Sequence, residues 1–151
     1  MKKYLFLLIA VVLMSCQEDT DIGRPRTTMG VAFYDPDHRR LTVDSLTVIA
    51  MGMQGDSLLY DRFSGQRLSL PLRYVGEETQ FILRRGTRQS DTLTIRHKNT
   101  PHFLSMDAGY TMYYDLQSLH VTHHAINTAT ILNPSVIAGE QENISIQYPL
   151  Y

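Results

Sequence analysis

The 151-residue sequence contains no tryptophan, only one cysteine, Cys16, and no excess of basic side chains. A single thiol cannot form an intramolecular disulfide or supply the paired cysteines of a structural zinc site. With 14 basic and 15 acidic side chains, the chain offers no positive surface for nucleic acid. It also has no motif for a nucleophile elbow, a phosphate-binding loop or a dinucleotide-binding turn. We therefore predict a protein that is not an enzyme, has no catalytic residue and no cofactor, and does not bind nucleic acid.

Cys16 ends a segment that has the parts of a bacterial export leader. Lys2 and Lys3 give a positive start, and residues 4–13 are uncharged and mostly apolar. That stretch is about half as long as the roughly 20 residues that a membrane-spanning helix needs. The tetrapeptide Leu13-Met14-Ser15-Cys16 follows and resembles the lipobox of bacterial lipoproteins. The resemblance implies a signal peptide, residues 1–15, that is removed, and a covalent lipid such as palmitate on Cys16 that anchors the chain to a membrane.

Residues 16–26 are polar, include Gly and Pro, and show no apolar periodicity. We expect them to form the lipidated end and a flexible tether ahead of the folded domain. The acidic start of this tether is similar to the export signal that takes some Bacteroidota lipoproteins to the cell surface. An outer-membrane location is therefore expected, with the cell surface slightly favoured and the periplasmic face left open.

Residues 27–151 have the length of one domain, and their apolar side chains alternate with period two. The alternation is clearest in Thr92–Arg96, and turn-forming residues separate the alternating segments. This pattern predicts an all-β fold, a single antiparallel β-sandwich of immunoglobulin-like type with seven to eight strands. Pro71 cannot donate a ladder hydrogen bond, so its segment is expected to be an edge strand or a bulged one.

Six segments stand out by their order and spacing along the chain. They are Phe33-Tyr34-Asp35, Leu68–Leu72, Asp91–Ile95, Thr122–Asn127, Asn133–Val136 and Glu142–Ile146. Together they resemble a family of small Bacteroidota outer-membrane lipoproteins that is classified only as a domain of unknown function. The resemblance implies a lipid-anchored β-sandwich and no particular reaction.

The histidines His120, His123 and His124 form a cluster whose imidazoles could bind zinc or copper. On a strand, His120 and His124 would share a face while His123 pointed away, so three ligands would need a bulge or a turn. The alternative is that His123 or His124 forms a hydrogen bond that holds a loop corner.

Two groups of side chains are candidates for partner contact. Arg84, Arg85 and Arg88 surround a turn that could meet phosphates or an acidic partner, although charges at strand ends often only keep edges soluble. Tyr113 and Tyr114 are neighbours that would face opposite ways on a strand, one exposed and one in the core.

Three Asp-Ser/Thr-apolar triplets resemble the O-glycosylation sites that some Bacteroidota use. Their acceptor residues would be Ser45, Ser57 and Thr92, with Ser57 the best placed because it lies next to a turn.

The leading functional hypothesis is a non-enzymatic accessory lipoprotein that docks on an outer-membrane β-barrel or its assembly machinery. A surface module that binds glycans or another ligand is the second hypothesis, and a metal-binding protein that uses the histidine cluster is the third.

Overall fold

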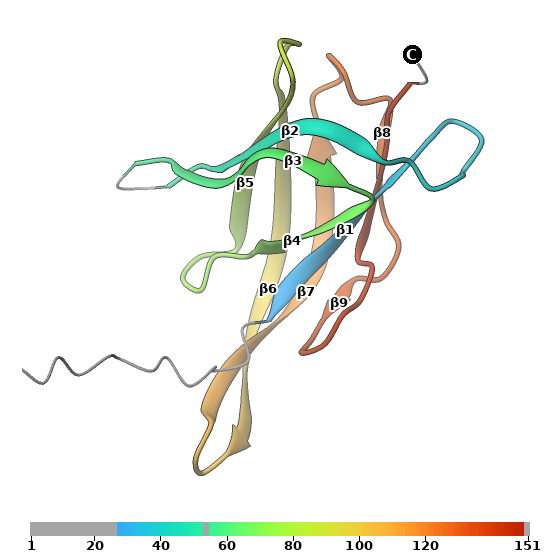
Figure 1. Ribbon diagram of the computed structural model, residues 1–151. Helices are drawn as coiled ribbons and strands as arrows, with labels where there is room; N and C mark the ends of the chain where they lie inside the picture. Colours follow the sequence, from blue (N-terminus) through green and yellow to red (C-terminus); the bar gives the residue numbers. More distant parts are fainter. Residues whose placement is uncertain (1–26, 53–54, 150–151) are drawn as a thin grey trace, which may run out of the picture.

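The computed structural model describes residues 27–52 and 55–149, and within them the chain forms ten strands and no helix (Figure 1). None of the described residues belongs to a helix long and apolar enough to cross a membrane. The strands are β1 (Thr28–Tyr34), β2 (Val43–Ala50), β3 (Ser57–Gly65), β4 (Arg67–Pro71), β5 (Glu78–Arg85), β6 (Asp91–Ser105), β7 (Gly109–Val121), β8 (Thr128–Ile131), β9 (Ser135–Val136) and β10 (Ile144–Gln147).

The strands form two sheets packed face to face. One sheet has the order β4-β1-β10-β8 and the other β3-β2-β5-β6-β7-β9. All pairs are antiparallel except β1 with β10. The predicted all-β sandwich is confirmed, with ten strands in place of seven to eight.

The core lies between the sheets and consists of the residues whose alternation the sequence displays. Phe33, Phe81, Ile95 and Ile146 are all completely buried there. Ile95 and Ile146 come from strands that turn polar residues to the other side, so their period-two alternation matches a sheet with one buried face.

Strand β1 is buried on both faces because the chain before β10 covers its outer side. Asn143 Oδ1 accepts a hydrogen bond from Gly30 N at 3.0 Å, and Asn143 N donates to Gly30 O at 2.8 Å. A methyl group at Gly30 would overlap the carbonyl oxygen of Gln141. Only glycine fits at this position.

Strand β4 lies at the edge of its sheet, and it carries Pro71 at its end, as predicted. The free edge is partly capped by Tyr60 of β3. Its hydroxyl donates to Ser69 O at 2.8 Å and accepts from Ser69 N at 3.3 Å. Such capping removes backbone groups that could otherwise pair with another chain.

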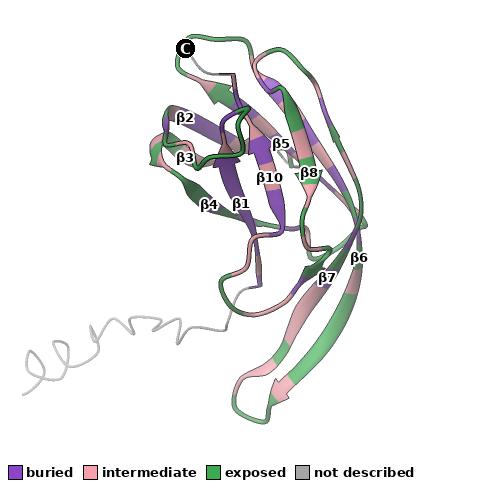
Figure 2. Cartoon of the chain, turned by 90° about the vertical axis from the view of Figure 1, so that its right-hand side faces the viewer, coloured by how far each residue is buried: buried purple, intermediate pink, exposed green. Residues whose placement is uncertain are grey.

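Strands β6 and β7 are the longest, and their outer halves leave the sandwich as a hairpin arm (Figures 1 and 2). The pairing continues from Asn99 opposite Tyr114 to Ser105 opposite Gly109. Towards its end the arm carries exposed and half-buried residues, with no sheet packed against it (Figure 2). The turn between β5 and β6 lies at the opposite end of the molecule (Figure 1).

Candidate functional site

The three predicted metal ligands lie at the end of β7 and in the loop after it. His120 is exposed in β7, while His123 and His124 belong to the loop that leads to β8. His123 Nδ1 lies 3.1 Å from Ile126 O, and His124 Nδ1 lies 3.2 Å from Asp91 Oδ1. Among the residues that the structure describes, no three His, Cys, Asp or Glu side chains are grouped as a metal site would require. The contacts match the loop-corner alternative, and metal binding stays a prediction.

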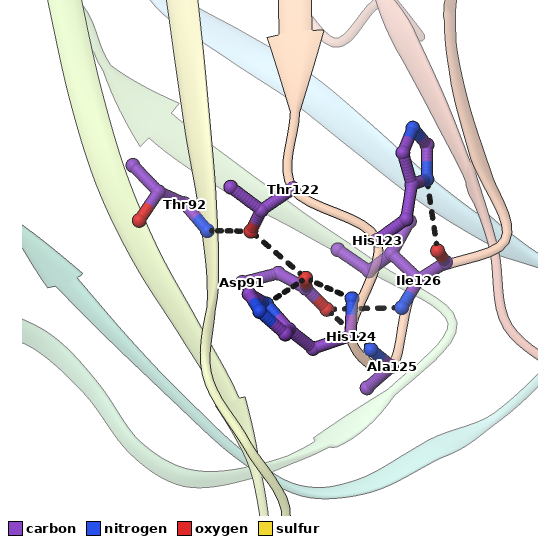
Figure 3. A network of polar contacts seen from close by, with 7 residues as sticks. All are labelled: Asp91, Thr92, Thr122, His123, His124, Ala125 and Ile126. Atoms are coloured by element: carbon purple, nitrogen blue, oxygen red, sulfur yellow. Dashed lines mark hydrogen bonds and ion pairs between the residues drawn. The ribbon is translucent and has the colours of Figure 1, made fainter.

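Asp91 is the centre of this corner (Figure 3). Its side chain is 1% exposed, and each carboxylate oxygen accepts hydrogen bonds from the loop. Oδ1 accepts from Thr122 Oγ1 at 2.9 Å and from His124 N at 2.7 Å, and Oδ2 accepts from Ala125 N at 2.8 Å and Ile126 N at 2.9 Å. The start of β6 is thereby fixed to the loop between β7 and β8.

The hydrogen bonds also determine the charge of Asp91. Burial by itself would raise the pKa of this carboxyl. The backbone N–H groups of residues 124–126 and the Thr122 hydroxyl outweigh burial, and they hold the pKa below its usual value. Asp91 is therefore a charged structural cap at neutral pH.

The turn that carries Arg84, Arg85 and Arg88 lies between β5 and β6. Arg84 is exposed, whereas Arg85 is half-buried with its guanidinium 5.5 Å from the ring centroid of Tyr148. Arg88 N donates to Arg85 O at 3.2 Å and closes the turn. Part of this cluster therefore packs on the sandwich, and Arg84 faces solvent.

The two predicted tyrosines differ in burial. Tyr114 is 6% exposed, and its hydroxyl donates to Leu72 O at 3.3 Å. Tyr114 is therefore the core member of the pair that the sequence predicts, because its side chain fills the core at the base of the arm and offers no surface to a partner. Tyr113 is half-buried on the arm, where its ring stacks on His102 with centroids 4.3 Å apart.

The three candidate O-glycosylation residues also differ in exposure. Ser57 is exposed at the start of β3, whereas Ser45 and Thr92 are half-buried in β2 and β6. Exposure leaves Ser57 the most accessible acceptor, and its modification stays a prediction.

Residues 73–77, in the loop between β4 and β5, are held in place by side-chain hydrogen bonds from other parts of the fold. The two N–H groups of the Asn99 amide are shared among three of the loop's carbonyls, with Nδ2 at 3.1 Å from Arg73 O, 3.0 Å from Tyr74 O and 2.8 Å from Gly76 O. The Arg73 guanidinium donates to Met51 O at 2.7 Å, which ties the loop to the end of β2. The backbone of this loop is therefore held from two sides.

His97, which is 1% exposed, holds the Asn99 side chain in place by a hydrogen bond. The amide nitrogen of Asn99 donates to the loop carbonyls. The other amide atom, Asn99 Oδ1, therefore accepts a hydrogen bond from His97 Nδ1 at 2.6 Å. His97 Nε2 is then left to accept from Thr79 Oγ1 at 2.8 Å. Burial lowers the pKa of His97 more than the Asn99 hydrogen bond and Glu77 raise it, so the imidazole is neutral.

Apolar side chains on this loop face solvent. Tyr74 is 64% exposed and Val75 is 83% exposed. Glu77 and Glu78, which follow this loop in the chain, help to line an open polar cleft of about 540 Å³. Its lining residues are Glu77, Glu78, Arg96, His97, Lys98 and Gln117. An apolar centre next to charges of both signs is the arrangement of a protein-binding surface. We call Tyr74, Val75 and the cleft the docking surface.

The docking surface was not predicted from the sequence. The sequence from Val75 to Glu77 is typical of an ordinary turn, and Asn99 is one of several polar residues of a strand. The available signal was a tyrosine and a valine directly before a turn glycine, where polar residues are usual.

Comparison with known proteins gives one match. The model of the family of unknown function DUF6452 matches residues 45–148, which is most of the described domain. The chain belongs to this family. The match to DUF6452 begins in β2 and ends directly after β10, so it includes the docking surface, the arm and the Asp91 corner. The predicted membership of a domain-of-unknown-function family is confirmed. No curated protein and no solved structure matches the chain.

Proposed function

We propose that this protein is a non-enzymatic accessory lipoprotein of the Bacteroidota outer membrane that docks on an outer-membrane β-barrel or its assembly machinery. The leader with its lipobox-like end supports the anchor, with residues 1–15 removed and acyl chains on Cys16. Membership of DUF6452 is consistent with this role and specifies no reaction.

The observation that carries the docking proposal is the preorganised loop at residues 73–77. A flexible loop loses conformational entropy when it binds, and this cost reduces affinity. Here Asn99 has already ordered the backbone through three hydrogen bonds, while Tyr74 and Val75 stay exposed. Rigid aromatic side chains surrounded by a polar rim are the usual centres of binding energy at protein interfaces.

The docking test compares two variants of the lipidated protein in affinity purification from native outer membranes. The double variant Tyr74→Ser, Val75→Ser removes the apolar centre of the docking surface. Leu58→Ser is the matched control, because Leu58 is 59% exposed on β3 and is not part of the docking surface. We expect the wild type and the control to retain one stoichiometric membrane protein and the double variant to lose it. Equal recovery with all three would exclude this surface as the docking site.

The anchor is tested separately by metabolic labelling with an alkyne-tagged fatty acid. We expect label on the wild type and none on Cys16→Ala, because Cys16 is the only thiol in the chain. An unlabelled wild-type protein would contradict the anchor and leave the docking test to be judged on its own.

A further inference from the structure

The hairpin arm formed by β6 and β7 ends in exposed apolar side chains. Met106 in the turn is 90% exposed, and Tyr110 and Phe103 are 67% and 47% exposed. Phe103 and Tyr110 are paired across the two strands, with ring centroids 5.1 Å apart. We call these three residues the arm tip. Exposed apolar patches of this kind mark contact with a protein or a membrane.

The described chain begins beside this arm. Thr27 Oγ1 lies 3.2 Å from Thr111 Oγ1, and Thr111 is paired with His102 within the arm. The apex of the turn at Asp107 is four residues from Thr111 (111 − 107). At about 3.3 Å per residue, the apex extends about 13 Å beyond the point where the preceding chain joins the domain.

The chain between Cys16 and Thr27 has a matching reach. It spans 11 residues (27 − 16), which can extend to roughly 38 Å at most. A coil of this length, as the sequence predicts for residues 16–26, has an end-to-end distance of about 18 Å. Acyl chains on Cys16 and the arm tip can thus meet one bilayer without stretching the tether.

We propose that the arm tip lies in the interfacial layer of the same bilayer that holds the lipid on Cys16. This inference rests on the anchor in the proposed function. Tyrosine suits the interface because its ring is apolar and its hydroxyl is polar. The His102–Tyr113 stack comes next along the arm and reaches the headgroup level. Exposed Asp107 at the apex limits the depth of insertion and favours neutral over anionic lipids.

A second membrane contact would fix the orientation of the domain. The lipid alone leaves the sandwich free to tilt around its tether, whereas lipid and arm tip together define an axis. Asn99 is eight residues from the apex (107 − 99), which corresponds to about 26 Å along the arm. The docking surface would then be held at a set height above the bilayer, where the exposed part of a membrane protein can meet it.

The absence of tryptophan makes a direct test possible, because one introduced tryptophan is the only one in the protein. Met106→Trp places the probe at the arm tip, and Leu58→Trp is the control at an exposed position on β3. Each lipidated protein is reconstituted into phosphatidylethanolamine–phosphatidylcholine vesicles that contain lipids brominated near the headgroup. We expect at least threefold stronger quenching for Met106→Trp than for Leu58→Trp, together with a blue-shifted emission. Adding Asp107→Asn to Met106→Trp should increase the quenching further.

A second preparation tests the arm-tip contact independently of acylation in cells. The single thiol of Cys16 is coupled in vitro to a maleimide phospholipid, so the chain is anchored whether or not cells acylate it. Strong quenching at position 106 in this preparation supports the arm-tip contact even if labelling in cells fails. Equal, weak quenching at positions 106 and 58 in both preparations overturns it and leaves the arm tip as a surface for a protein partner.

Discussion

Replacing Asp91 by asparagine tests how strongly one buried carboxylate holds the domain together. An asparagine side chain has nearly the same shape, but it offers one oxygen in place of two. Its NH2 group would face either the N–H groups of Ala125 and Ile126 or the Thr122 hydroxyl and the His124 N–H, and the donors on that side would lose their acceptor. The variant therefore loses two charge-assisted hydrogen bonds and leaves their donors buried.

The expected loss of unfolding free energy is about 3–5 kcal/mol, because hydrogen bonds to a charged group contribute about 1.5–3 kcal/mol each. The side chain is 1% exposed, so solvent does not screen these contacts. Urea unfolding followed by circular dichroism measures the effect, and with a slope near 2 kcal/mol per molar the midpoint falls by roughly 2 M. Asp44→Asn on the exposed face of β2 is the control and should change stability by less than about 0.5 kcal/mol. A loss below about 1 kcal/mol for Asp91→Asn would refute the capping argument.

Asp91 also predicts how stability changes with pH. Its pKa is lowered in the folded state, so the folded protein binds this proton less readily than the unfolded chain. The stabilisation is complete above the unfolded pKa of about 3.9 and is lost as pH falls further, through the lower folded pKa. Asp91→Asn should remove this part of the acid slope. An unchanged slope would contradict the assignment.

Three further predictions concern the docking surface and β1. The pKa of His97 is lowered in the folded state, so its stabilising effect is present above the unfolded pKa of about 6.5 and is lost as pH falls through the folded value. His97→Gln should flatten that pH dependence in urea titrations, and an unaltered slope would show that His97 is not its source. Asn99→Ala should cost about 3 kcal/mol, since the two amide N–H groups and Oδ1 of Asn99 lose their partners, and it should raise hydrogen exchange across residues 73–77. Unchanged exchange there would mean that Asn99 does not order the loop. Gly30→Ala should cost at least about 2 kcal/mol, because its methyl group meets the Gln141 carbonyl, and a thermal midpoint equal to that of wild type would contradict this close approach.

The sequence predicted those strands that bury one face. Residues such as Ile95 and Ile146 alternate with polar neighbours because a sheet places successive side chains on opposite sides. The outer half of β6 could not be predicted in this way, since Thr100, Pro101 and Phe103 are all exposed and no buried face produces a period. The hydrophobic periodicity of the sequence therefore does not predict the arm that β6 and β7 form.

The polar centres of the structure depend on contacts between distant residues, which no local pattern reveals. Asp91 was interpreted as the first residue of a possible modification triplet, yet its partners are 31–35 residues later in the chain. Asn99 bonds to a loop that lies 23–26 residues earlier. In both cases the local sequence gives the residue type, and the fold determines its role.

The most direct test of the account is photo-crosslinking in living cells with a photoreactive amino acid in place of Val75, at the centre of the docking surface. The same amino acid in place of Leu58 on β3 is the control. The account predicts that position 75 gives one discrete adduct with an outer-membrane protein, that position 58 gives none, and that Cys16→Ala weakens the adduct. The absence of any adduct at position 75, or the same set of adducts from both positions, would contradict it.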